Sequence, residues 1–169
     1  MCNLCAMARV GTILVLLLLA GCAAGGDPGP SGKDPPERRE LRVESLDSGA
    51  PFEGPRRPRV VVAPSAEALS KELGAGVRAS GEGTYLAVQW GARPTGGYSI
   101  GVAGATVEGR RVTVRLALEA PPEDAIVAQV LTYPYAVSVL KDLDPAGKEF
   151  SLVDGKGETL DWPIRRVGG

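Results

Sequence analysis

The chain has 169 residues, with 19 basic and 20 acidic side chains and no histidine. This near balance of charge argues against nucleic acid as a partner, because phosphate binding requires a concentrated basic face. The lack of histidine excludes Ser-His-Asp and Cys-His catalysis and every metal site that relies on imidazole. From the sequence we expect no cofactor and no metal.

A short apolar run near the N-terminus predicts where the protein is located. Residues 10–20 follow Arg9 and are too few to span a bilayer about 30 Å thick, but they have the length of a signal-peptide core. The run ends in Leu-Ala-Gly-Cys, which resembles the bacterial lipoprotein box, whose cysteine sulfur takes a diacylglyceryl group before cleavage. We therefore expect residues 1–21 to be a lipoprotein signal peptide and Cys22 to be lipidated. An ordinary secretory signal and a buried helix are the alternative interpretations.

A lipoprotein signal predicts an extracytoplasmic protein, anchored to the outer face of the bacterial cell membrane or to the outer membrane of a Gram-negative cell. Cleavage would remove Cys2 and Cys5 and leave Cys22 acylated, so the mature chain would have neither a disulfide nor a free thiol nucleophile. Residues 22–40 are rich in glycine and proline, end in a charged run and contain no apolar residue larger than alanine. They predict a disordered tether.

Residues 41–169 are expected to form one β-rich domain. The only helix we predict is capped by Ser65, has Leu69 and Leu73 on one face, and ends at Gly74. Alternation of apolar and polar residues, or short apolar runs bounded by turn residues, predicts strands. The strand ranges are 41–46, which ends at Asp47-Ser48-Gly49, and 59–63, 84–90, 98–107, 112–119, 126–131, 135–140, 150–153 and 159–164.

Two of these strand pairs are expected to form hairpins. Period-two alternation on both sides of the turn at 108–111 indicates a β-hairpin over 98–119, and Gly101 and Gly104 suggest a bulge in its first arm. A turn at 154–157 predicts a last hairpin. About nine short strands and one short helix predict an all-β fold, either a small antiparallel β-sandwich or a partly open barrel.

Two segments that interrupt strands contain three of the four tyrosines, and both are candidate binding segments. In the first, paired glycines permit positive φ or a close backbone approach. The tyrosines either bury their rings at strand ends or form a binding surface, since tyrosine is enriched in interface hot spots. The candidate residues, for partner binding or for structure, are Thr95, Gly96, Gly97, Tyr98, Thr132, Tyr133, Pro134 and Tyr135.

The two interpretations differ in strength along these segments. Tyr135 alternates with Val137 and Val139, which favours a structural role, whereas both interpretations stay open for residues 95–98. A fold of short antiparallel strands collects its loops at its ends. We therefore expect Thr95, Tyr98 and Tyr133 to lie near one another and to contact a partner.

These motifs also carry a resemblance to a known family. Gly91 to Tyr98 (GARPTGGY), a following hairpin, Pro121-Pro122 and then QVLTYPY at 129–135 resemble the C-terminal domain of the PrcB protease-complex subunit family. The resemblance covers residues 85–143. Residues 41–73 are similar to the strand, turn and helix that commonly precede that domain, and the tail after Pro145 has no counterpart.

The resemblance implies an envelope-anchored β-domain that binds another protein. The family's namesake is an envelope lipoprotein that helps a secreted subtilisin-like protease complex to form or persist, so the partner could be a protease. An inhibitor-like module, with the loop 94–98 in a protease cleft, and another envelope ligand-binding domain are the alternatives. We do not expect an enzyme, because the acid pairs Glu123-Asp124 and Asp142/Asp144 lie at turn-like positions beside prolines and no serine is placed near a buried lysine.

Overall fold

The computed structural model describes residues 36–168, so the predicted signal peptide, Cys22 and the tether up to residue 35 lie outside the described residues. In the described part of the chain no helix is long and apolar enough to cross a membrane. Residues 36–168 form one helix and nine strands. They are β1 (Arg38–Leu41), β2 (Val43–Gly49), β3 (Arg59–Ala63), α1 (Ala66–Leu73), β4 (Gly83–Gln89), β5 (Ser99–Glu108), β6 (Arg111–Glu119), β7 (Tyr135–Lys141), β8 (Glu149–Val153) and β9 (Ile164–Arg166).

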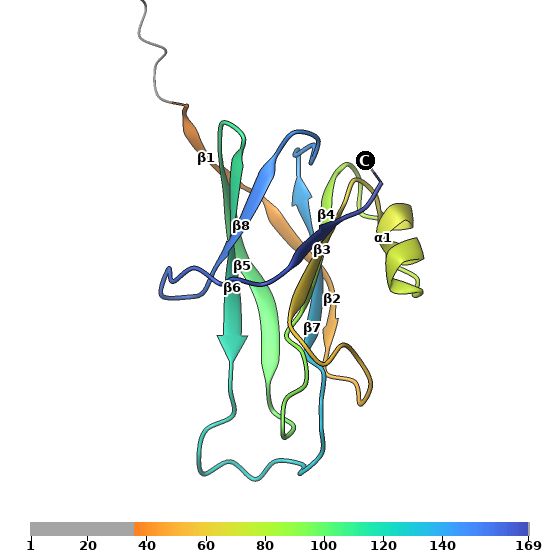
Figure 1. Ribbon diagram of the computed structural model, residues 1–169, viewed down its shortest axis with the longest axis vertical. Helices are drawn as coiled ribbons and strands as arrows, with labels where there is room; N and C mark the ends of the chain where they lie inside the picture. The colour runs from red at the N-terminus through yellow and green to blue at the C-terminus, as the bar shows by residue number, and fades with distance from the viewer. Residues whose placement is uncertain (1–35, 169) are drawn as a thin grey trace, which may run out of the picture. The chain divides into compact units, whose positions relative to one another are not determined.

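The strands form two sheets that pack face to face as a β-sandwich (Figure 1). One sheet has the order β1-β5-β6-β8 and the other β2-β7-β4-β3-β9. The predicted all-β sandwich is confirmed, but the sheets are mixed, since β8 runs parallel to β6 and β9 parallel to β3. The expectation that the strands are antiparallel is wrong for these two pairs. Both β8 and β9 follow a crossover of the chain from the other sheet, and a crossover allows parallel neighbours.

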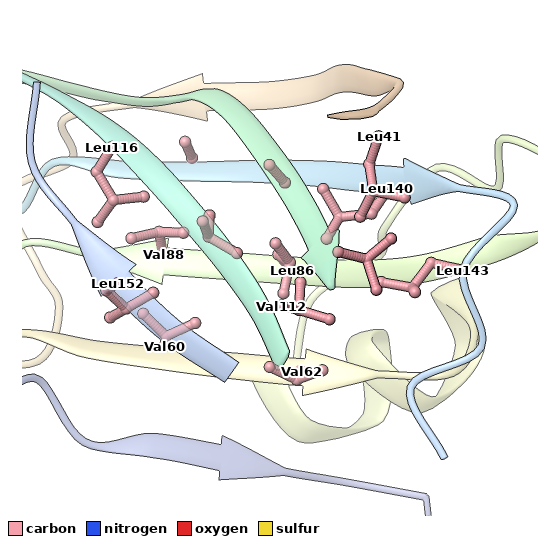
Figure 2. Packing of buried hydrophobic residues seen from close by; sticks show 14 of the residues in the cluster. Leu41, Val60, Val62, Leu86, Val88, Val112, Leu116, Leu140, Leu143 and Leu152 are labelled. Atoms are coloured by element: carbon pink, nitrogen blue, oxygen red, sulfur yellow. The ribbon is translucent and has the colours of Figure 1, made fainter. Parts of the chain in front are cut away.

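The main core lies between the two sheets, as Figure 2 shows from close by. The inner face of β6 supplies Val112, Val114 and Leu116, whereas Thr113 and Arg115 lie on its outer face. One-sided burial explains why the sequence of this strand alternates so cleanly. Labelled core residues from the other strands and from the β7–β8 connection include Leu41, Val60, Val62, Leu86, Val88, Leu140, Leu143 and Leu152.

The five-stranded sheet is covered on both faces. Its outer face carries a second buried cluster, in which Leu69 of α1 packs with Val61 and Tyr85. This double coverage explains the continuous apolar run at residues 60–63 of β3, which a strand with one face in solvent would not need. The helix begins after Ser65, whose side chain accepts a hydrogen bond from the Ala68 amide, and ends at Gly74 with φ of 66°.

Two expectations for the N-terminal part of the domain are wrong. The predicted disordered tether reached residue 40, but Arg38–Leu41 is strand β1, paired with β5. A sheet-edge strand needs only backbone partners, so its first three side chains stay exposed and charged, as suits an edge. The predicted stop at Asp47-Ser48-Gly49 is also absent, because β2 passes a register shift between Ser45 and Asp47 and continues to Gly49.

Two further expectations for the C-terminal part need correction. Residues 126–131 form no strand, since no neighbouring strand is available to complete their backbone hydrogen bonds. The last hairpin forms only its turn, where Val153 and Thr159 make a single bridge. The chain then crosses to the other sheet, and its final strand is β9 rather than residues 159–164.

Candidate binding site

The two tyrosine-bearing segments meet at the end of the sandwich where β4 leads into β5 and β6 leads into β7 (Figure 1). The Arg93 amide donates to the Thr132 carbonyl (2.8 Å), and the Thr132 amide donates to the Arg93 carbonyl (3.0 Å). Thr132 is only 4% exposed, and its hydroxyl donates to the Thr95 carbonyl (2.8 Å). Thr132 therefore fastens one candidate segment to the other.

The adjacent glycines of the first segment play different parts. The Gly96 amide donates to the Ala128 carbonyl (2.9 Å), and a side chain at this position would meet nothing closer than 3.7 Å. Gly97 has φ of 84°, and a Cβ there would lie 2.9 Å from Cβ of Pro121 and 3.1 Å from Val127. Only Gly97 is thus required both by backbone conformation and by space.

Trp90, Arg93 and Tyr98 form a half-buried stack beside this loop. The Trp90 and Tyr98 rings meet edge to face with centroids 5.6 Å apart. The Arg93 guanidinium lies 4.9 Å from the centre of the Trp90 ring, and its Nη2 donates to the Trp90 carbonyl (3.0 Å). Its Nε is buried without a hydrogen-bond partner among residues 36–168, so the aromatic face supplies part of the compensation for this charge.

Tyr133 is half-buried beneath residues 50–58, a segment that the sequence did not single out as part of the site. Its amide donates to the Pro51 carbonyl (2.9 Å), and a Cβ on Gly54 would lie 2.6 Å from Cβ of Tyr133. The β2–β3 connection, residues 50–58, therefore becomes the third segment of this end. Its sequence signal was Phe52, a large apolar residue within a run rich in glycine and proline.

Pro134 and Tyr135 have structural partners. Pro134 is buried, and its carbonyl accepts a hydrogen bond from the Trp90 amide (2.9 Å). The Tyr135 hydroxyl donates to the Asp47 carboxylate (2.8 Å). This hydrogen bond, followed by partial burial and by the negative charge of Asp47, raises the pKa of the Tyr135 hydroxyl. The structural interpretation favoured for Tyr135 agrees with this geometry, while the binding role of the other candidates stays a prediction.

The segments of this end also carry the large apolar side chains that the domain leaves exposed. In the described residues these are Phe52 (73% exposed) on the β2–β3 connection and, on the β6–β7 connection, Ile126 (105%), Val130 (41%) and Leu131 (56%). The β6–β7 connection forms the long loop at the bottom of Figure 1. Exposed apolar side chains gathered on neighbouring loops are typical of protein–protein contact sites. For convenience we call residues 50–58, 91–98 and 120–134 together the motif end.

Asp142 and Asp144, one of the two acidic pairs named in the sequence, lie in the connection between β7 and β8. Asp144 accepts a hydrogen bond from the Ala146 amide (2.9 Å) and so supports a turn. Asp142 adopts a left-handed backbone conformation with φ of 56° between β7 and that turn. Among residues 36–168 no group of three or more acidic, cysteine or histidine side chains is arranged to hold a metal.

Residues 84–141 match a family model described as PrcB C-terminal. The match includes all the candidate residues from Thr95 to Tyr135, and it confirms the resemblance predicted from the sequence. No curated protein and no solved structure was found to match the chain.

Proposed function

We propose, from the membership of residues 84–141 in the PrcB C-terminal family, that this PrcB-like chain is a non-catalytic protein-binding module. Its partner is an extracytoplasmic protein, with a secreted protease complex as the first candidate. The module holds that partner at the membrane through a lipid on Cys22 and stabilises or positions it.

The observation that carries the proposal is the construction of the motif end. Backbone hydrogen bonds from Thr132 to Arg93 and from Tyr133 to Pro51 join three separate connections into one surface. That surface displays Ile126 and Leu131, which no core requires. A rigid support beneath exposed apolar side chains lowers the entropy lost on association, which favours binding.

The same construction favours a docking surface over an inhibitor loop. The Thr132 hydroxyl holds residues 95–98 through the Thr95 carbonyl, and Gly97 lies so close to Pro121 and Val127 that a side chain there would clash with them. A loop that enters a protease cleft would have to protrude from the domain, whereas this one lies against the β6–β7 connection. We therefore place stabilisation before inhibition.

The test is site-specific photo-cross-linking of the full-length protein in its own cell envelope. A cross-linking amino acid at Leu131 should join a distinct protein, which mass spectrometry then identifies. The same amino acid at Ala146, an exposed residue on the connection between β7 and β8 at the opposite end of the sandwich, is the matched control. Equal cross-linking at both positions, or none at Leu131, would contradict the proposal.

Removal of the protein then separates stabiliser from inhibitor. If the chain stabilises the cross-linked partner, the partner's lifetime in the envelope should shorten when the chain is deleted. If the chain is an inhibitor, the partner's activity should rise instead while its amount is unchanged.

A further inference from the structure

One edge of the four-stranded sheet is only half occupied. Strand β5 spans Ser99–Glu108 and pairs with β6 along its whole length. On its other side, β1 pairs only with Ala105–Glu108. No strand within residues 36–168 pairs with the outer side of Ser99–Gly104, whose backbone hydrogen-bonding groups on that side remain free for another strand.

This open edge lacks the usual protection against pairing. Its sequence, Ser-Ile-Gly-Val-Ala-Gly, contains no charged residue and no proline. The four edge strands of the two sheets, β1, β2, β8 and β9, each carry at least one charged side chain, among them Arg39, Glu44, Glu149 and Arg165. Charges on edges discourage pairing with foreign strands, and their absence leaves an edge ready to pair. The register shift between Val102 and Gly104 limits the regular stretch to Ser99–Val102, so a strand added here is short.

Gly101 provides an independent indication at the same place. It lies opposite Ala117 of β6, its φ is not positive, and a Cβ on it would meet no atom within 4 Å. Neither backbone conformation nor packing within the described chain requires glycine there. A glycine inside a strand weakens it, and such a residue often marks a place where another backbone comes close.

From these observations we infer that the outer edge of β5 at Ser99–Gly104 binds an extended segment of the partner protein, which joins the sheet as an additional strand. The inference deepens the proposed function and rests on it. In this mode of binding, backbone hydrogen bonds supply affinity and flanking side-chain contacts supply specificity. The flanking contacts are available at the motif end, because Tyr98 precedes the edge directly and Gly97 lies near Val127 of the β6–β7 connection, which a Cβ on Gly97 would approach to 3.1 Å.

The geometry favours a segment of the partner over two other sources of a strand, which are a second copy of this chain and the residues that precede β1. In an antiparallel pairing of β5 with a second copy, the folded loop before the copy's β5 would approach Leu41, which already pairs with Ala105. The start of the described chain lies at the other end of β5, where Pro36 lies beside Gly109. A flexible extended segment meets neither obstacle.

The test is amide hydrogen exchange of the full-length protein, read at residues 99–104. The probe is a short peptide of alternating threonine and valine in large molar excess, and the control is the same peptide with every amide N-methylated. The unmodified peptide should slow exchange at these amides, whereas the N-methylated peptide, which lacks the donors for a ladder, should not.

Two variants distinguish the half of β5 that has no partner on its outer side (Ser99–Gly104) from the half that pairs with β1 (Ala105–Glu108). Gly101→Lys places a charge at the open edge and should abolish the slowing. Thr106→Lys places the same charge on the same strand opposite Glu40, where β1 already fills the edge, and should preserve it. Unchanged exchange with the unmodified peptide, or slowing confined to the edge strands β1, β2, β8 or β9, would overturn the inference.

If exchange at residues 99–104 slows with rising protein concentration when no peptide is present, a second copy of the chain occupies the edge, and the inference is overturned. Cross-linking at Leu131 together with unchanged exchange at 99–104 would leave the binding function in place and refute only the strand addition.

Discussion

Gly96 and Gly97 are neighbours with unequal constraints, and substitutions should separate them. Gly97→Ala should lower the free energy of unfolding by about 1–2 kcal/mol, because a side chain is strained at φ of 84° and would meet Pro121. Gly96→Ala is the matched control and should change stability by less than about 0.5 kcal/mol, since its surroundings leave ordinary contact distances. Urea unfolding measures both values. Equal losses at the two positions would show that the loop does not depend on the left-handed conformation.

The Tyr135–Asp47 hydrogen bond predicts a pH effect with a definite sign. Because the pKa of Tyr135 is raised in the folded protein, its stabilising contribution is complete below the ordinary tyrosine pKa of about 10 and is lost as the pH rises through the raised value. Asp47→Ala should lower the pKa of Tyr135 toward the ordinary value, as measured by tyrosinate absorbance against a Tyr135→Phe reference. Asp161→Ala, at an exposed acid between β8 and β9, should leave the titration unchanged. A titration unaffected by Asp47→Ala would refute the role of this bond.

At the scale of elements, the helix α1 offers a clean test of local sequence signals. Ser65→Ala should reduce stability by about 1 kcal/mol, because the hydroxyl accepts a hydrogen bond from the Ala68 amide (3.1 Å) that a methyl group cannot replace. Ser65→Asp keeps an acceptor at the cap and should retain most of the stability. Thermal unfolding of the two variants measures the difference, and an alanine variant as stable as the aspartate variant would contradict the cap.

The elements that could be predicted were those whose pattern is set locally. The alternation in Val112–Leu118 reports burial on one face, and Ser65 and Gly74 are the usual caps of a helix. The apolar run at 126–131 gave a false strand because apolar residues signal burial only when a neighbouring element exists to cover them. Strand β1 was missed for the opposite reason, since its backbone pairs while its charged side chains remain in solvent.

The candidate site was predictable only in part. Clustering of tyrosines identified the segments 95–98 and 132–135, and the structure brings them together through Thr132. The contribution of Pro51 and Gly54 could not be predicted, because it depends on one backbone hydrogen bond between Tyr133 and Pro51, which are 82 positions apart in the sequence (133 − 51). Contacts of that kind leave no periodicity in the sequence.

At the scale of the whole molecule, the boundary of the folded unit can be measured. A fragment of residues 36–169 should melt cooperatively, with no change on adding a reducing agent or a chelator, since its core is built from residues within it. Beginning at Arg42 instead should lower stability by about 2 kcal/mol, because it removes Leu41, which is 6% exposed, together with the ladder from β1 to β5. Equal melting of the two fragments would show that β1 adds nothing, and a loss of the transition with chelator would reveal a carboxylate metal site.

Attachment of the whole protein to a membrane should depend on Cys22. A diacylglyceryl group with a further acyl chain anchors a protein stably, whereas one chain alone holds it only marginally. Cys22→Ser should therefore accumulate as an uncleaved precursor or appear in the soluble fraction, as followed by fractionation and by the mass of the mature protein. Cys5→Ser changes a cysteine within the predicted signal peptide and should be processed and retained like the parent. If Cys22→Ser is instead cleaved and sediments with membranes as the parent does, the lipid on Cys22 is not the anchor, and a partner bound at the motif end would have to hold the protein there.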